Sequence, residues 1–179
     1  MKVLDCPEQT GQPSTDSEDE LVRFDVEYLL KCLGLIRSTQ YLIIMQPDTS
    51  QRNLPQPDYL VKDTQCNLVV VEHARFFESQ NARKKLAQKL RSFNVAYGLL
   101  NTPDPADLGK RLTEFFDNKL AKGQLASFTQ CEKILLARNR WSDARVNTLL
   151  KAEPYFNPQC RQDCDHFFLI VSGQLLEIF

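Results

Sequence analysis

Two acidic residues, Asp58 and Glu72, stand next to apolar segments, where an ionised carboxylate is costly unless it is paired, hydrogen-bonded or bound to a cation. Asp58 begins the segment DYLV, and Glu72 comes near the end of NLVVVEH. If these segments are neighbouring strands, the two carboxylates repel each other, and a hard divalent cation relieves that repulsion. Mg²⁺ held by such oxygens can bind a phosphate and lower the pKa of an attacking water. The pair is therefore a candidate Mg²⁺ site for phosphodiester hydrolysis.

The segments that carry these acids have the composition of β-strands. The stretch 67–73 is rich in valine, and the polar residues KDTQC separate it from 58–61 as a short turn. Because strand side chains alternate between faces, Glu72 and Ala74 share one face, and His73 lies on the other. Glu72 is thus expected at the end of an apolar strand and half buried.

Helices and further strands surround this pair. Ser17 and Glu20 fit a capping box ahead of a helix whose apolar residues recur at helical spacing up to Gly34. The other predicted elements are strands at 41–45, 95–100 and 134–137, helices at 82–93, 103–120 and 146–150, and two final strands joined by a turn at Gly173-Gln174. This order predicts an α/β (α+β) fold with a mixed central sheet flanked by helices.

The sequence Pro57-Asp58, followed by Glu72 on the next strand, resembles the motif of the PD-(D/E)xK nuclease superfamily, which has the restriction-endonuclease-like fold. A leading helix, a strand at 41–45 and a helix after Glu72 extend the resemblance over roughly residues 18–93. The resemblance implies a restriction-endonuclease-like core, Asp58 and Glu72 as catalytic metal ligands, and Mg²⁺ as the cofactor. It implies a Mg²⁺-dependent nuclease whose substrate is a nucleic acid.

One position departs from the family pattern. The lysine of the motif would fall at position 74, which is Ala74. In such enzymes that lysine orients or activates the water and offsets charge in the transition state. The nearest replacements in sequence are Lys84 and Lys85, on the helix that follows. For an active site, one of them should point toward Glu72, and the sheet should open to solvent there.

The alternative is a catalytically silent member of the same fold that binds a protein or a nucleic acid. Ala74 favours this alternative, whereas the retained carboxylates favour the nuclease. The helix at 82–93 carries a basic surface that could follow a phosphate backbone, although a solvated helix face explains the same pattern. The residues of this candidate nucleic-acid-binding surface are Arg83, Lys84, Lys85, Lys89 and Arg91.

Composition limits the remaining classes of protein. The chain of 179 residues has 22 basic and 23 acidic side chains, so no global positive charge indicates a nucleic-acid partner. We expect no membrane partner and a cytoplasmic location, because neither a secretory signal nor an apolar run long enough to span a bilayer is present. The six cysteines are accordingly expected as free thiols.

The chain is expected to form one domain. Residues 1–16 are rich in polar, acidic and proline residues and are predicted to be a disordered tail. Residues 17–179 are predicted to form a single nuclease-like α/β domain. The apolar C-terminal hairpin is expected to belong to its core. The oligomeric state is left open.

Overall fold

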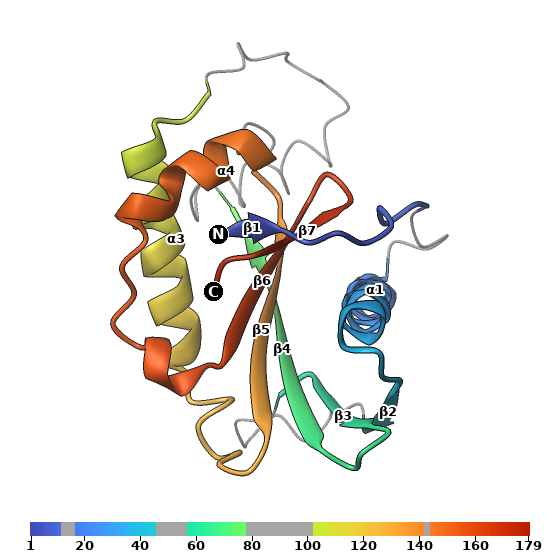
Figure 1. The fold of residues 1–179 in the computed structure, drawn as a ribbon. Coiled ribbons are helices and arrows are strands. Elements are labelled where there is room, and N and C mark those ends of the chain that lie inside the picture. The colour runs from blue at the N-terminus through green and yellow to red at the C-terminus, as the bar shows by residue number, and fades with distance from the viewer. Residues whose placement is uncertain (12–16, 46–56, 78–101, 142–143) are drawn as a thin grey trace.

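The computed structural model describes residues 1–11, 17–45, 57–77, 102–141 and 144–179 (Figure 1). The helices are α1 (Glu18–Arg37), α3 (Pro105–Leu120) and α4 (Val146–Ala152), with the short 3₁₀ turns η2 (Glu153–Tyr155) and η3 (Arg161–Asp163). The strands are β1 (Lys2–Val3), β2 (Tyr41–Met45), β3 (Tyr59–Asp63), β4 (Leu68–Phe76), β5 (Glu132–Asn139), β6 (His166–Val171) and β7 (Gln174–Glu177).

These strands form one mixed sheet between two layers of helices. Within the described residues the strand order is β1-β7-β6-β5-β4-β3-β2. The strand β4 pairs antiparallel with β3 and parallel with β5, which in turn pairs parallel with β6. Figure 1 shows α1 on one face of the sheet and α3 with α4 on the other. The predicted α/β class and mixed sheet are confirmed.

Each face of the sheet has its own apolar core. On the face of α1, Val69 and Val71 are buried together with apolar residues of that helix. On the face of α3, Val70 and Ala74 are buried with apolar residues of that helix. The alternation of β4 side chains is therefore as predicted, and it places Glu72 on the face of α3.

The hairpin of β3 and β4 sets the register of the candidate site. Tyr59 lies opposite Val71, and Lys62 lies opposite Leu68. Asp63 closes the turn, because its Oδ1 accepts hydrogen bonds from the backbone N–H groups of Gln65 and Asn67, both at 2.8 Å. This turn holds the two strands in a single register.

The first helix is longer than its sequence pattern predicts. It continues past Gly34 to Arg37, and it ends at Ser38, whose left-handed backbone (φ 51°) lets its N–H donate to the Gly34 carbonyl. At the other end, Ser17 occupies the N-cap position, but its side chain makes no capping hydrogen bond. The predicted capping box is therefore absent on the serine side, and Gly34 serves as an acceptor within the last turn.

The helix α3 begins at Pro105, two residues after the predicted start at position 103, and a side-chain cap precedes it. Asp104 is the N-cap, and its carboxylate accepts from the N–H groups of Ala106 and Asp107. Gly109 allows close packing here, since a Cβ atom at that position would stand 2.7 Å from the carbonyl oxygen of Ala152. The glycine thereby brings α3 directly against α4.

The two ends of the chain differ from each other in how well they were predicted. Phe167 and Leu175 are fully buried, so the C-terminal hairpin belongs to the core as expected. Its turn residues are Ser172 and Gly173, both with positive φ, one position earlier than predicted.

Residues 1–11 differ from the predicted disordered tail, since they include β1, which pairs with β7. Residues 12–16 lie outside the described residues.

Candidate functional site

Asp58 and Glu72 are brought together at the start of β3. Continuing the pairing of Tyr59 with Val71 by one step places Asp58 opposite Glu72, and directly opposed residues of an antiparallel pair share one face. Asp58 Oδ2 accepts a hydrogen bond of 2.7 Å from the backbone N–H of His73. The side chain of Asp58 thus ends the ladder of β3 and β4, and its other oxygen accepts no hydrogen bond from the described residues. The predicted neighbourhood of the two carboxylates is present.

Glu72 is more deeply buried than the sequence pattern predicts. Its residue is 2% exposed, whereas we expected it half buried and open to solvent. Burial raises the pKa of Glu72 to about 7, and the charge of Asp58 acts in the same direction. Its Oε2 is buried without a hydrogen-bond partner among the described residues. The described residues therefore compensate the ionised form of Glu72 only in part.

The compensation comes from a lysine that sequence reasoning missed. Lys119, in the last turn of α3, donates a hydrogen bond of 2.9 Å from Nζ to Glu72 Oε1. The charge of Lys119 opposes the rise of the Glu72 pKa, with a smaller contribution from Lys122. Lys119 follows Leu112 by seven residues and Phe115 by four, so it lies on the apolar side of its helix. A lysine on the apolar side of a predicted helix indicates a buried acidic partner, and this was the signal by which the sequence could have identified Lys119.

The residues at this site fit a hard divalent cation in their chemistry. Glu72 Oε2 and Asp58 Oδ1 are two carboxylate oxygens that accept no hydrogen bond from the described part of the chain. A divalent cation would relieve both the burial of Glu72 and its repulsion from Asp58, the two causes of the raised pKa. The described residues gather no third acidic, histidine or cysteine ligand. Water and a phosphate would complete the coordination, as is usual for Mg²⁺.

The remaining predicted site residues lie outside the described residues. They are Arg83, Lys84, Lys85, Lys89 and Arg91, together with the whole predicted helix at 82–93 and strand at 95–100. The roles predicted for these side chains stay predictions. Among the described residues, the lysine beside the carboxylates is Lys119.

A second buried acid occupies the opposite face of β4. Asp25 of α1 is fully buried, and its Oδ2 lies 2.9 Å from His73 Nε2 and 2.7 Å from Arg138 Nε. Gln9 adds a hydrogen bond of 3.2 Å to Oδ1. Burial acts to raise the pKa of Asp25, but the hydrogen bonds from Arg138 and His73 outweigh it and lower the pKa to about 2. This carboxylate is ionised and fully paired.

His73 connects the two acids. Its ring contacts Asp25 on the face of α1. Its backbone N–H donates a hydrogen bond to Asp58, the neighbour of Glu72. Because an ionised carboxylate only accepts hydrogen bonds, Nε2 of His73 carries the proton. The ring contact therefore fixes the part of β4 on which Asp58 depends.

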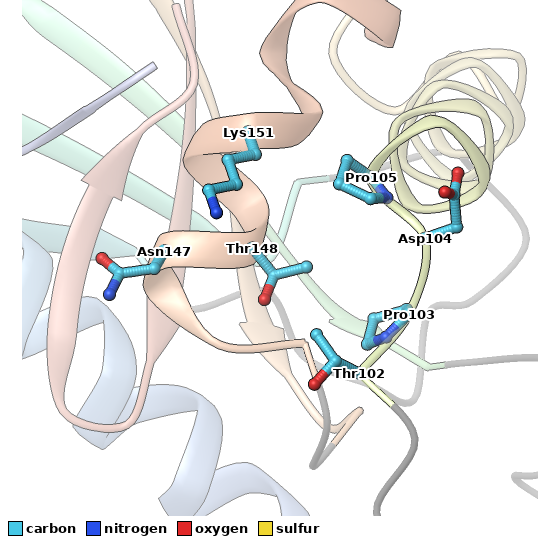
Figure 2. A pocket seen from close by; sticks show the side chains of 7 residues that line it. All are labelled: Thr102, Pro103, Asp104, Pro105, Asn147, Thr148 and Lys151. Carbon is cyan, nitrogen blue, oxygen red and sulfur yellow. The ribbon is translucent and has the colours of Figure 1, made fainter.

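A surface pocket lies at the other end of α3. It has a volume of about 430 Å³ and is lined by Thr102, Pro103, Asp104, Pro105, Asn147, Thr148 and Lys151. Figure 2 shows these side chains around the start of α3 and along α4. A helix of 16 residues is about 24 Å long, so the pocket is well separated from Lys119 in the last turn. The pocket is not part of the carboxylate site.

Comparisons with protein families, curated proteins and solved structures found no match for this chain. No helix in the described ranges combines the length and apolar character needed to cross a membrane.

Proposed function

We propose that this protein is a PD-(D/E)xK-like, Mg²⁺-dependent nuclease in which Asp58 and Glu72 bind the metal and Lys119 takes the place of the missing lysine. The observation that carries the proposal is the buried Oε2 of Glu72, which has no hydrogen-bond partner among the described residues, with Asp58 beside it and Lys119 at the other oxygen. A structural carboxylate in such a position would be expected to have all its oxygens satisfied.

The order of elements supports the same proposal. The helix α1 precedes an antiparallel meander of β2, β3 and β4, and the next strand after α3 joins β4 in parallel. This is the order expected of a restriction-endonuclease-like core, with the acids on its second and third strands. A lysine on the helix α3 rather than at position 74 would preserve the charge of the motif from a different element.

In this proposal each residue has a separate task. A Mg²⁺ ion bound at the pair would polarise a phosphodiester and lower the pKa of a water molecule. The backbone N–H of His73 holds one oxygen of Asp58, and the other oxygen, which accepts no hydrogen bond from the described residues, would bind the metal. The ammonium of Lys119 contacts Glu72 in the structure, and in this proposal it would offset negative charge that develops on the phosphate.

The same pair gives support to the silent alternative. Glu72 is 2% exposed, and Lys119 satisfies one of its oxygens, so the site is closed to a phosphate in this arrangement. A protein that only binds a partner could keep this ion pair as part of its core. Metal binding and cleavage therefore have to be tested separately.

Metal binding is tested by calorimetric titration with Mg²⁺ and Mn²⁺. The wild type should bind one ion, and Glu72→Gln or Asp58→Asn should weaken binding by about tenfold or more, because each removes one anionic ligand. The exposed acid of α3, Glu114, provides a matched control as Glu114→Gln. Near pH 6, binding should release protons, since the metal must displace the proton that Glu72 retains. Absence of binding at millimolar metal would remove the nuclease proposal.

Cleavage is tested with labelled single-stranded DNA, duplex DNA and RNA in the presence of each metal. Lys119→Met should reduce the cleavage rate by about a hundredfold while metal still binds, because its charge acts on the phosphate. Lys110→Met, an exposed lysine on the same helix, is the control and should leave the rate unchanged. A protein that binds Mg²⁺ but cleaves none of the three substrates would favour the silent alternative.

A further inference from the structure

Three arginines stand in a group at the carboxyl ends of two parallel strands, on the face of α1. Arg75 of β4 and Arg138 of β5 are opposite each other in the register. Arg140 follows β5 and continues its line, because its N–H donates a 2.7 Å hydrogen bond to the carbonyl of Phe76. Since side chains alternate along a strand, Arg140 is on the same face as Arg138. The separation is about 4.8 Å between strands and about 6.6 Å along a strand.

Two of these arginines are held by acids of α1. Arg138 is bound by both oxygens of the buried Asp25, and its Nη2 also contacts Gln9. Arg75 Nη2 lies 3.3 Å from Oε1 of Glu18, whose side chain is 66% exposed. Arg138 is thus fixed and neutralised, whereas the ion pair of Arg75 within the described residues is with an acid that water can also solvate.

The third arginine has no acid of its own among the described residues. Arg140 is exposed, and no hydrogen bond or ion pair of its side chain is found within the described chain. Although the residue is exposed, part of its side chain is shielded from water, and this shielding lowers the pKa of Arg140. The positive charges of Arg138 and Arg75 lower the pKa further. The group therefore has an excess of positive charge at its outer end, where an anion would relieve the repulsion.

From this arrangement we infer that Arg75 and Arg140 contact successive phosphates of a nucleic-acid backbone, with Arg138 as the positioning residue between them. A guanidinium group presents two parallel N–H donors that match a phosphate, and a row of them fits a polyanion that offers several phosphates in line. The choice of nucleic acid as the polyanion rests on the proposed function. The contact itself does not involve Asp58 or Glu72.

A change at Glu18 should affect nucleic-acid affinity in the direction opposite to a change at an arginine. Glu18 is in the first turn of α1, and it competes with a phosphate for Arg75. Glu18→Gln should therefore tighten binding, whereas loss of an arginine should weaken it. A purely structural role of the arginines would not produce this pair of effects.

The test is fluorescence anisotropy with labelled single-stranded and duplex oligonucleotides in EDTA, so that no metal-dependent cleavage occurs. Arg140→Gln and Arg75→Gln should each raise the Kd by about three- to tenfold and reduce the slope of log Kd against log salt by about one phosphate contact. Arg161→Gln, an exposed arginine that precedes β6 at the other end of the sheet, is the matched control and should change neither quantity. Thermal unfolding should confirm that each variant folds as the wild type does.

Two results would overturn the inference. One is a wild type that binds neither oligonucleotide at low salt. The other is an equal loss of affinity in Arg161→Gln and Arg140→Gln, which would show that only net charge matters. Both results leave the metal titration untouched, so the arginine contact and the proposed nuclease site can fail independently.

Discussion

Two buried carboxylates lie on opposite faces of the sheet at β4, Asp25 from α1 and Glu72 from β4 itself. Their pKa values are shifted in opposite directions. Asp25 is 0% exposed and Glu72 is 2% exposed, so burial alone disfavours the charge of both. The pKa of Asp25 is lowered to about 2, whereas that of Glu72 is raised to about 7. The difference must come from their partners.

The partners differ in number and in geometry. Asp25 accepts from Arg138, His73 and Gln9, which together engage both of its oxygens. Among the described residues Glu72 accepts only from Lys119, and it has Asp58 as a like-charged neighbour. A completed network stabilises a buried charge, while an incomplete one leaves part of the cost of burial uncompensated. The difference supports a structural role for Asp25, and it is the basis for the binding role proposed for Glu72.

The largest effect is expected from Asp25→Asn. This change removes the counter-charge of Arg138 and replaces one acceptor oxygen with an amide N–H₂ group that faces other donors, and breaking a buried pair costs about 3–5 kcal/mol of unfolding free energy. Urea unfolding at neutral pH measures it, with Glu27→Gln, an exposed acid two residues further along α1, as the control. In the wild type this stability is complete above pH 3.8 and is lost as the pH falls through about 2. A cost below about 1 kcal/mol would contradict a structural role.

Glu72→Gln should change stability in the opposite direction. Because the folded-state pKa of about 7 lies above the ordinary value of 4.5, the folded protein retains a proton that the unfolded chain releases. The stability linked to that proton is complete below pH 4.5 and is lost as the pH rises through about 7.

The variant does not titrate, so it should be more stable than the wild type by about 1–3 kcal/mol near pH 8 and similar to it near pH 5. Denaturant unfolding at several pH values measures this difference in metal-free buffer. A variant less stable than the wild type at high pH would show that Glu72 is as well satisfied as Asp25, and the comparison would fail.

A smaller effect is expected when the counter-charge of Glu72 is removed. Lys119→Met should raise the pKa of Glu72 above its wild-type value, since Lys119 lowers it both by its charge and by its hydrogen bond. The cost should be about 1 kcal/mol at a pH above 8, where the carboxyl must otherwise be ionised. The carboxyl carbon of Glu72, followed by NMR through a pH titration, reports the shift directly. An unchanged titration would mean that Lys119 contacts Glu72 only weakly.

The smallest effect concerns a neutral group. The hydroxyl of Tyr59 is buried without a hydrogen-bond partner in the described part of the chain, and burial raises the pKa of Tyr59 to about 12. Tyr59→Phe removes this polar atom, and the change should be neutral or stabilising by up to about 1 kcal/mol. Thermal unfolding measures it. A substantial loss of stability would show that the Tyr59 hydroxyl makes a favourable interaction. In that case the lack of a hydrogen-bond partner among the described residues would not identify a binding site in this protein.

The fold was predictable where one pattern decided the structure. The valine-rich segment at 67–73 alternates faces as expected, and the helix predicted over 103–120 is present as α3. The end of α1 was not predictable from Gly34, because the backbone of Ser38 terminates the helix instead. The pairing of β1 was missed because a strand of two residues is too short to show a periodic pattern, and its partner lies far away in the sequence.

The candidate site was predictable in its acids and not in its cation. Asp58 and Glu72 come from a hairpin, whose local register brings them together. Lys119 is 47 positions from Glu72, and only the packing of α3 on the sheet joins them. The network around Asp25 was missed for the same reason, since Arg138 and Gln9 approach it from distant parts of the chain.

The pairing of β1 with β7 also sets the order in which the molecule can assemble. Lys2 and Val3 find their partners in Glu177 and Leu176, and the backbone N–H of Gln9 donates to the carbonyl of Gly173. During synthesis the first strand must therefore wait until the last strand has emerged from the ribosome. Contacts of such long sequence separation make folding slow. Gln9 touches both Asp25 and Arg138, so this late step also completes the network on the face of α1.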